Sequence, residues 1–321
     1  MGRWRLHPNL EDADLVGRAR QHNFSLNTND DGLRATLNRD RTPYSWRLAI
    51  LGDSTTLGWG VDLEDSLGEV IAARLQENTS LQVEVLNGAQ PGYSTWQSVW
   101  LYGEVVRHYR PDAVILFLPL HDQNRVIVSD REYQEGGDGV LAKTRVWFAT
   151  NSRIYAGLRK LRYQRASDIQ LPADGMTRER RSQRVPVEDR IEAIERLRKI
   201  NEVNGVPVLL GLLPSYDDLK APSHAQLGKR VGVEAVLEYA RGEGLDLISA
   251  RDCCKLEEPF DGNAHAARLV FPFDKSHYSV EGSRRIGEAI AAQLTELGFP
   301  GKQFATEPAA VPAPDEGEAT H

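Results

Sequence analysis

The chain has 321 residues, with 39 Lys and Arg against 46 Asp and Glu, so its formal net charge is −7. Hydrophobic residues make up 40% and charged residues 26%, as in ordinary soluble globular proteins. The mildly acidic balance argues against general affinity for nucleic acid, and the absence of any run of about 18 apolar residues argues against a transmembrane segment. No apolar region follows the basic start, so we expect no ordinary secretory signal peptide.

The only two cysteines are neighbours, Cys253 and Cys254. Adjacent cysteines rarely form a disulfide, because bridge geometry strains the single peptide between them. No Cys/His spacing typical of a zinc site occurs. We therefore expect two reduced thiols in a cytoplasmic protein with no metal. A redox role for the pair is the alternative.

Short apolar runs alternate with helical patterns along the chain. Nearly continuous Val, Ile and Leu is what strands buried on both faces require. The runs that we interpret as strands are 47–51, 82–86, 112–118, 206–213 and 245–249. The helical patterns cover 66–75, 95–108, 188–203, 231–240 and 280–297. This alternation predicts an α/β fold with five parallel strands, right-handed crossovers and helices on both faces of the sheet.

Three stretches do not fit the alternation. Residues 1–45 are polar and loop-like, and 300–321 are rich in proline and acids, which predicts a disordered tail. Between them, 46–299 is expected to form one domain that carries an Arg-rich insertion at 128–187. The basic run at 178–184 either meets an anionic partner or is a hydrated loop, and we favour the hydrated loop.

The first predicted strand runs directly into Gly52, Asp53 and Ser54, after which a helix begins. This order places the Ser54 hydroxyl at the carboxyl edge of the sheet, where ligands bind in open α/β folds. The start of the helix also leaves backbone N–H groups unpaired near Ser54, and these can stabilise an oxyanion. A serine that only caps the helix is the alternative.

A serine nucleophile needs a base, usually a histidine that a carboxylate orients. Asp274 and His277 stand three residues apart, on a predicted turn just before the last helix. The carboxylate can therefore reach Nδ1 of the imidazole and leave Nε2 to face Ser54. An aspartate that caps the helix beside a surface histidine is the alternative, and it is less favoured once Ser54 is considered.

The loop after the second predicted strand carries Gly88 and Gly92 around Pro91. Two glycines around a proline let the backbone turn tightly, and an amide N–H there can point at an oxyanion. An ordinary strand–helix loop is the alternative.

Four segments of the chain together resemble the SGNH (GDSL) hydrolase family. They are GDSTTLGWGVD, NGAQPGYST, DAVILFLPLHD and FDKSHYSVEGSRRIGEAIAAQL, spread over residues 47–297. The polar segment 28–34 is also similar to the Asn-Ser-x-Gly-x-Arg lead-in of some bacterial members. The resemblance implies a flavodoxin-like three-layer α/β/α sandwich and serine ester hydrolysis with no metal or organic cofactor.

Carried over residue by residue, the resemblance assigns a role to each matching position. It implies that Ser54 is the nucleophile and also an oxyanion donor through its own N–H. Gly92 would be the second donor, His277 the general base, and Asp274 the residue that orients the base.

One block departs from the family pattern. Family members carry Gly-x-Asn-Asp after the third strand, where the Asn side chain is the third oxyanion donor. This chain has Pro119, Leu120, His121 and Asp122 there. A neutral imidazole has one N–H and can donate as an amide does, with Asp122 or Asn124 fixing the tautomer. We favour His121 as the substitute donor. The alternatives are that Asn124 or water fills the role, or that the site is weakened or tuned to a different reaction.

These observations predict a serine esterase that acts on a small-molecule or carbohydrate ester through an acyl-enzyme on Ser54. An O-acyltransferase on the same site is one alternative, and a non-hydrolytic binding module with a degenerate oxyanion hole is another. We expect Trp59 and Tyr93, on loops at the same sheet edge, to line the substrate.

Overall fold

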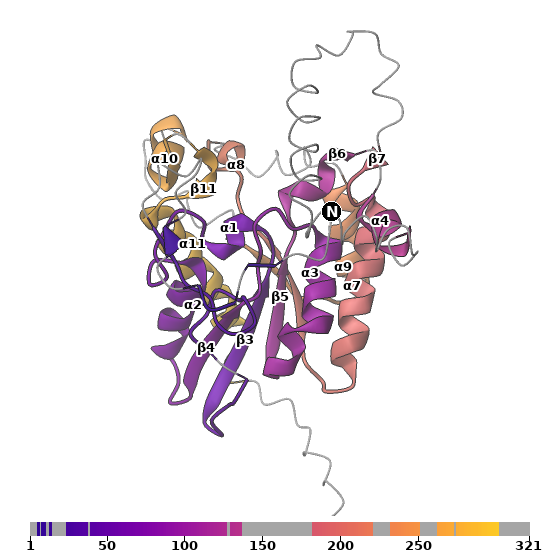
Figure 1. Ribbon diagram of the computed structural model, residues 1–321. Coiled ribbons are helices and arrows are strands. Elements are labelled where there is room, and N and C mark those ends of the chain that lie inside the picture. The colour runs from indigo at the N-terminus through magenta and orange to yellow at the C-terminus, as the bar shows by residue number, and fades with distance from the viewer. Residues whose placement is uncertain are drawn as a thin grey trace, which may run out of the picture.

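A five-stranded parallel sheet forms the centre of the protein in the computed structural model (Figure 1). The structure describes residues 5–6, 8–10, 13–14, 24–37, 39–126, 129–136, 182–220, 232–250, 262–272 and 274–301. The strands of the sheet are β3 (Ser45–Leu51), β4 (Gln82–Asn87), β5 (Ala113–Phe117), β8 (Val208–Leu212) and β9 (Leu247–Ser249).

The strands lie in the order β4-β3-β5-β8-β9, and every neighbouring pair is parallel. Counted along the chain, this is the order 2-1-3-4-5 of flavodoxin-like sheets. The prediction of five parallel strands is confirmed, with each strand end within two residues of its expected place. Strands β5 and β8 are buried along their whole length, which explains why their apolar residues do not alternate with polar ones.

Helices cover both faces of the sheet (Figure 1). On one face, α2 (Leu67–Gln76) and α11 (Val280–Glu296) pack with Leu48 and Ile50 of β3 in one apolar cluster. On the other face, α3 (Thr95–Glu104), α7 (Val187–Glu202) and α9 (Val233–Gly242) pack with Ala49 and Leu51 in a second cluster. The fold is therefore the predicted three-layer α/β/α sandwich. In the part of the chain that the structure describes, no helix has the length and apolar character needed to cross a bilayer.

Shorter elements complete the described chain, and several of them lie at one end of the sheet, namely α1, β11, β6 and β7 (Figure 1). The short elements, with η for a 3-10 helix, are β1 (Ala13–Asp14), β2 (Ser25–Leu26), α1 (Ser54–Leu57), η1 (Val106–Tyr109), η2 (Leu120–Gln123), β6 (Arg125–Val126), α4 (Asp130–Gly136), β7 (Ser182–Gln183), α8 (Tyr216–Lys220), α10 (Gly262–Leu269), β10 (Val270–Phe271) and β11 (Asp274–Tyr278).

Two local predictions are wrong. The segment with Asp274 and His277, predicted as a turn, forms strand β11, which pairs antiparallel with β10. Strand β10 has only two residues, too few to show a strand pattern in the sequence. The helix predicted over 95–108 is divided into α3 and η1, because Val105 between them has the non-helical dihedral angles φ −131° and ψ −60°.

The chain leaves the sandwich for the insertion at β6 and returns at β7, and these two strands pair antiparallel. Residues 137–181 of the insertion, residues 302–321 of the tail, and Cys253 with Cys254 lie outside the described residues. The disordered tail and the cytoplasmic location stay predictions, as does the division at 1–45, 46–299 and 300–321.

Arg34, in the N-terminal segment, holds the end of the short helix α1 by hydrogen bonds to backbone carbonyls. The side chain of Arg34 is buried. Its Nη1 donates to the carbonyls of Leu57 (3.0 Å) and Gly58 (2.6 Å), and its Nη2 donates to that of Val61 (2.5 Å). Burial lowers the pKa of Arg34 to about 10, which leaves the guanidinium charged at neutral pH. The segment therefore satisfies carbonyls at the end of α1 that no helical N–H can reach.

We predict that Arg34→Ala lowers the free energy of unfolding by about 3 kcal/mol or more, because it removes a buried charged side chain together with its hydrogen bonds to three carbonyls and leaves a cavity. Arg39→Ala is the matched control from the same segment. Arg39 forms an ion pair with Asp31 and is 54% exposed, so its loss should cost less than about 1 kcal/mol. Urea denaturation followed by circular dichroism measures both, and equal losses would contradict the supporting role of Arg34.

Candidate active site

Ser54 lies at the point where β3 turns into α1. The side chain of Asp53 caps the helix by accepting a hydrogen bond from the Thr55 N–H (3.0 Å). The turn requires glycine at position 52, because a Cβ there would lie 2.2 Å from Thr56 Oγ1. Gly58 ends the helix with a left-handed φ of +82°. A helix of four residues thus holds Ser54 in its first position, with the residue 8% exposed.

A line of hydrogen bonds connects three side chains at this edge of the sheet. His277 Nε2 lies 2.8 Å from Ser54 Oγ, and His277 Nδ1 lies 2.5 Å from Asp274 Oδ2. Since the carboxylate accepts the Nδ1 proton, Nε2 of the neutral ring is free to accept the serine proton. The structure thus brings together Ser54 and His277, which are 223 residues apart in the sequence.

Strand β11 is fixed on both sides of the histidine. The Ser276 N–H donates to Asp274 Oδ1 (3.0 Å), which orients the carboxylate. The buried Tyr278 donates from its hydroxyl to the Pro214 carbonyl (2.5 Å). Ser279 then caps α11 by accepting from the Gly282 N–H (3.1 Å). These contacts fix the backbone from which the imidazole reaches Ser54.

Two backbone N–H groups of the site lack an acceptor. Within the described ranges, neither the Ser54 N–H nor the Gly92 N–H donates a hydrogen bond to another residue. The loop that carries Gly92 is attached to β3, because the Gln90 N–H donates to the Gly52 carbonyl (3.2 Å) and the Gly88 N–H to that of Ile50 (2.9 Å). Both N–H groups thus belong to segments that meet at the carboxyl end of β3.

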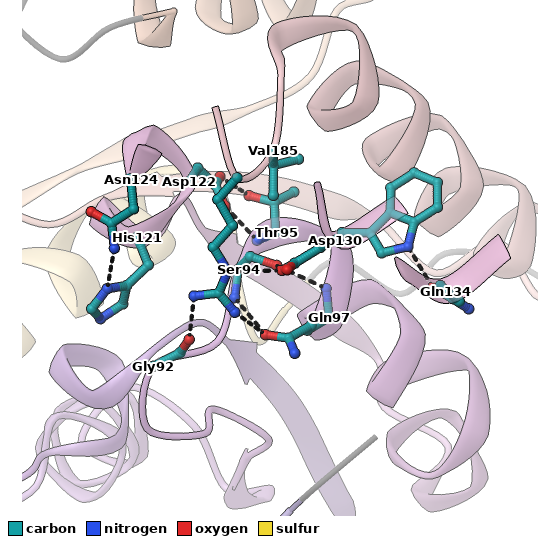
Figure 2. Close-up of polar contacts among 12 residues, drawn as sticks. Gly92, Ser94, Thr95, Gln97, His121, Asp122, Asn124, Asp130, Gln134 and Val185 are labelled. Carbon is teal, nitrogen blue, oxygen red and sulfur yellow. Dashed lines mark hydrogen bonds and ion pairs between the residues drawn. The ribbon is translucent and has the colours of Figure 1, made fainter. Parts of the chain in front are cut away.

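His121 lies beside the same turn, on η2. Its Nε2 is 3.9 Å from Asp53 Oδ2, and the side chain is 37% exposed. Asn124 donates from its side-chain amide to His121 Nδ1 (3.2 Å), as Figure 2 shows. Because Nδ1 accepts, the neutral imidazole carries its proton on Nε2. Of the two residues that the sequence suggested for fixing the tautomer, Asn124 makes the contact.

Asp122, next to His121, has a different role that the sequence analysis missed. It is buried and accepts hydrogen bonds from the Thr95 N–H (2.9 Å) and the Thr95 hydroxyl (2.5 Å) at the start of α3 (Figure 2). Arg190 Nε lies 3.6 Å from the same carboxylate. Burial raises the pKa of Asp122 to about 6, although Arg190 and Thr95 act to lower it. The available signal was an aspartate after a buried strand, which can serve a neighbouring helix N-terminus.

The two aromatic residues expected to line the substrate differ in position. The Trp59 ring is partly exposed and lies 6.4 Å from the His277 ring, between centroids. Tyr93 is 1% exposed and packs in the apolar cluster with α3. The prediction is therefore wrong for Tyr93, since its ring has no surface to offer a substrate. Trp59 stays a candidate.

No metal-binding group of three or more His, Cys, Asp or Glu side chains occurs among the described residues. The arrangement of Ser54, His277 and Asp274, with unpaired N–H groups nearby, has the geometry required for nucleophilic attack on a carbonyl group.

No family model matches the sequence, and neither does any curated protein. Solved structures with a similar trace include a psychrotrophic esterase from Pseudoalteromonas sp., with 11% identity and a TM-score of 0.45 over 78% of this chain and 97% of that chain. A lipase/acylhydrolase from Enterococcus faecalis has 14% identity and a TM-score of 0.45 over 78% and 96%. A GDSL-like lipase from Bacteroides thetaiotaomicron has 11% identity and a TM-score of 0.40 over 82% and 94%.

We predict that Asp122 makes stability depend on pH. Its folded-state pKa of about 6 exceeds its ordinary value of 3.8, so between these values the folded state holds a proton that the unfolded state has lost. The contribution of Asp122 to the free energy of unfolding therefore falls as the pH rises from about 4 to about 6, by about 3 kcal/mol at most. Asp122→Asn lacks this titration. Urea denaturation from pH 4 to pH 7 compares the two proteins, and parallel curves would contradict the prediction.

Proposed function

We propose that this protein is a serine esterase of the SGNH (GDSL) type, which cleaves carboxylic esters through an acyl-enzyme on Ser54. The observation that carries the proposal is the unbroken hydrogen-bonded line from Asp274 through His277 to Ser54 at the carboxyl edge of the sheet. A serine that only caps a helix needs no histidine on its hydroxyl and no carboxylate behind that histidine.

In the first step, Ser54 Oγ attacks the carbonyl carbon of the ester while His277 Nε2 takes the hydroxyl proton. Asp274 stabilises the imidazolium that forms, because its carboxylate accepts the Nδ1–H. The carbonyl π electrons move onto the oxygen, and the backbone N–H groups of Ser54 and Gly92 hold the resulting oxyanion.

In the second step, the tetrahedral intermediate collapses and the C–O bond to the leaving alcohol breaks. His277 gives its proton to that alcohol, which leaves the acyl group on Ser54. A water molecule then loses a proton to His277 and attacks the acyl carbon. The bond from that carbon to Ser54 Oγ breaks, His277 returns the proton to Oγ, and the carboxylic acid departs. A small-molecule or carbohydrate ester as the substrate stays a prediction from the sequence.

His121 serves as the third oxyanion donor in this proposal. Its tautomer places the ring proton on Nε2, and the 3.9 Å to Asp53 is too long for a hydrogen bond that would occupy that proton. The N–H is therefore free to donate to the oxyanion at the turn that also carries Ser54.

We predict that Ser54→Ala abolishes hydrolysis of short p-nitrophenyl esters, with a loss of about 10³-fold or more, because the nucleophile is gone. A fluorophosphonate probe should label the wild-type protein on Ser54, as mass spectrometry of the peptide will show. Ser276→Ala, whose hydroxyl takes no part in the line, is the neighbouring control and should be labelled normally. A wild-type protein that turns over no ester and takes no label would instead be a binding module.

We also predict a graded series at position 121. His121→Ala should lower kcat by about 10²–10³-fold, which is the usual cost of one oxyanion donor. His121→Asn should stay within about tenfold of the wild type, because the amide supplies an N–H from a similar place. Steady-state kinetics on p-nitrophenyl acetate measures the series, and equal rates for all three proteins would remove His121 from the oxyanion site.

A further inference from the structure

The loop that carries Gly92 is held by a buried arginine from the returning end of the insertion. Arg184 follows β7 directly, and its side chain is 7% exposed. Its Nη1 donates to the Gly92 carbonyl (2.7 Å), its Nε to Asp130 Oδ2 (2.9 Å) and its Nη2 to Gln97 Oε1 (2.6 Å). Figure 2 labels Gly92, Gln97 and Asp130, the three residues that supply these acceptors. One planar guanidinium thus joins the loop to α3 and α4.

The partners of this guanidinium are themselves fixed. Asp130 Oδ2 also accepts from the Ser94 hydroxyl (2.6 Å), and Gln97 Oε1 also accepts from the Ser94 N–H (3.3 Å). Ser94 and Gln97 form the capping box of α3. The arginine is therefore anchored to the first turn of a helix that is closed by a capping box, so its position is well defined.

The backbone around Arg184 is held as tightly as its side chain. The Arg184 N–H donates to the Asn124 carbonyl (2.7 Å), and the Arg184 carbonyl accepts from the Asp130 N–H (3.0 Å). The next residue, Val185, donates from its N–H to the Asp122 carbonyl (3.1 Å). Arg184 is thus fixed to the segment that carries His121 as well as to the Gly92 loop.

Gly92 has no side chain of its own to fix it in place. Its φ is +70°, and a Cβ built on it would meet no atom within 4 Å, so packing does not restrain it. The peptide between Gly92 and Tyr93 is instead held at both ends, since Arg184 binds its carbonyl and the Tyr93 N–H donates to the Gln90 carbonyl (3.2 Å). These two hydrogen bonds fix the peptide that follows Gly92, which limits how far the preceding peptide, with the Gly92 N–H, can rotate.

We infer that Arg184 is a positioning residue of the oxyanion site, which acts by aiming the Gly92 N–H at the developing oxyanion. The inference rests on the proposed function. For Arg184, the expectation of a hydrated loop is wrong, because its side chain is buried and bound within the protein. The rest of the basic run, 178–181, lies outside the described residues. The Arg184 guanidinium, at the end of the insertion, forms these hydrogen bonds within the protein.

The test compares Arg184→Met with the wild type on an ester and on its matched thionoester, in which sulfur replaces the carbonyl oxygen. Sulfur accepts hydrogen bonds weakly, so the thionoester gains little from the oxyanion donors. We expect Arg184→Met to lower kcat on the ester about 10- to 100-fold, with KM within about threefold. On the thionoester the loss should stay within about threefold. The ratio of kcat on the ester to kcat on the thionoester should therefore fall in Arg184→Met.

Two further variants separate positioning from general damage. Arg131→Met removes a neighbouring arginine that forms ion pairs with Asp189 and Glu192 of α7, so it should keep the wild-type ratio. Arg184→Lys keeps the charge and one donor, so it should restore part of the ratio, and it serves as the measured variant if Arg184→Met does not fold. Rates are normalised to the phosphonate-labelled fraction of each preparation.

An unchanged ratio in both Arg184 variants, together with a lower melting temperature, would overturn the inference and leave Arg184 a purely structural residue. That result is distinct from failure of the proposed function, in which the wild-type protein itself shows no Ser54-dependent turnover of either ester. The second result would overturn the inference as well.

Discussion

The hydrogen bond between Ser54 Oγ and His277 Nε2 joins α1, which follows the first strand of the sheet, to β11, which precedes the last helix. It forms because α11, which follows His277 closely, packs with α2 in the apolar cluster on one face of the sheet. The short helix α1 after β3 also meets β11 directly, because the Thr55 hydroxyl donates to the Ser276 carbonyl (3.4 Å). The hydrogen-bonded line therefore depends on packing between distant parts of the chain, and not on any local segment.

The part of the site with the proposed oxyanion donors is held by the opposite layer. Asp122 ties η2 to the start of α3, and Arg184 ties the Gly92 loop to the same turn of that helix. Ser54 thus lies between two parts of the site. Helix α11 supports the strand that carries His277, and α3 supports the Gly92 loop and η2. Each part is held by hydrogen bonds from side chains to backbone, which keeps the donors aimed before substrate arrives.

The sheet and the hydrogen-bonded line from Asp274 to Ser54 could be predicted from the sequence because their signals are local. A fully buried strand shows as a continuous apolar run, and the motifs around Ser54 and His277 stand directly at element ends. The other features of the site depend on contacts between segments that are far apart in the sequence. Such contacts produce no periodic pattern of apolar residues. Nothing in the sequence indicates that Arg34 meets the carbonyls of α1, that Arg184 meets the carbonyl of Gly92, or that Tyr93 turns inward.

The most direct test of the account is to trap the covalent intermediate during turnover. Rapid acid quench of the wild-type protein with a p-nitrophenyl ester, followed by peptide mass spectrometry, should show the acyl group on the peptide that contains Ser54. It should also show a burst of p-nitrophenol close to one equivalent of enzyme if deacylation is slower than acylation. An acyl group on a different residue of the wild-type protein would contradict the assignment of Ser54 as the nucleophile. So would an acyl group on the corresponding peptide of Ser54→Ala.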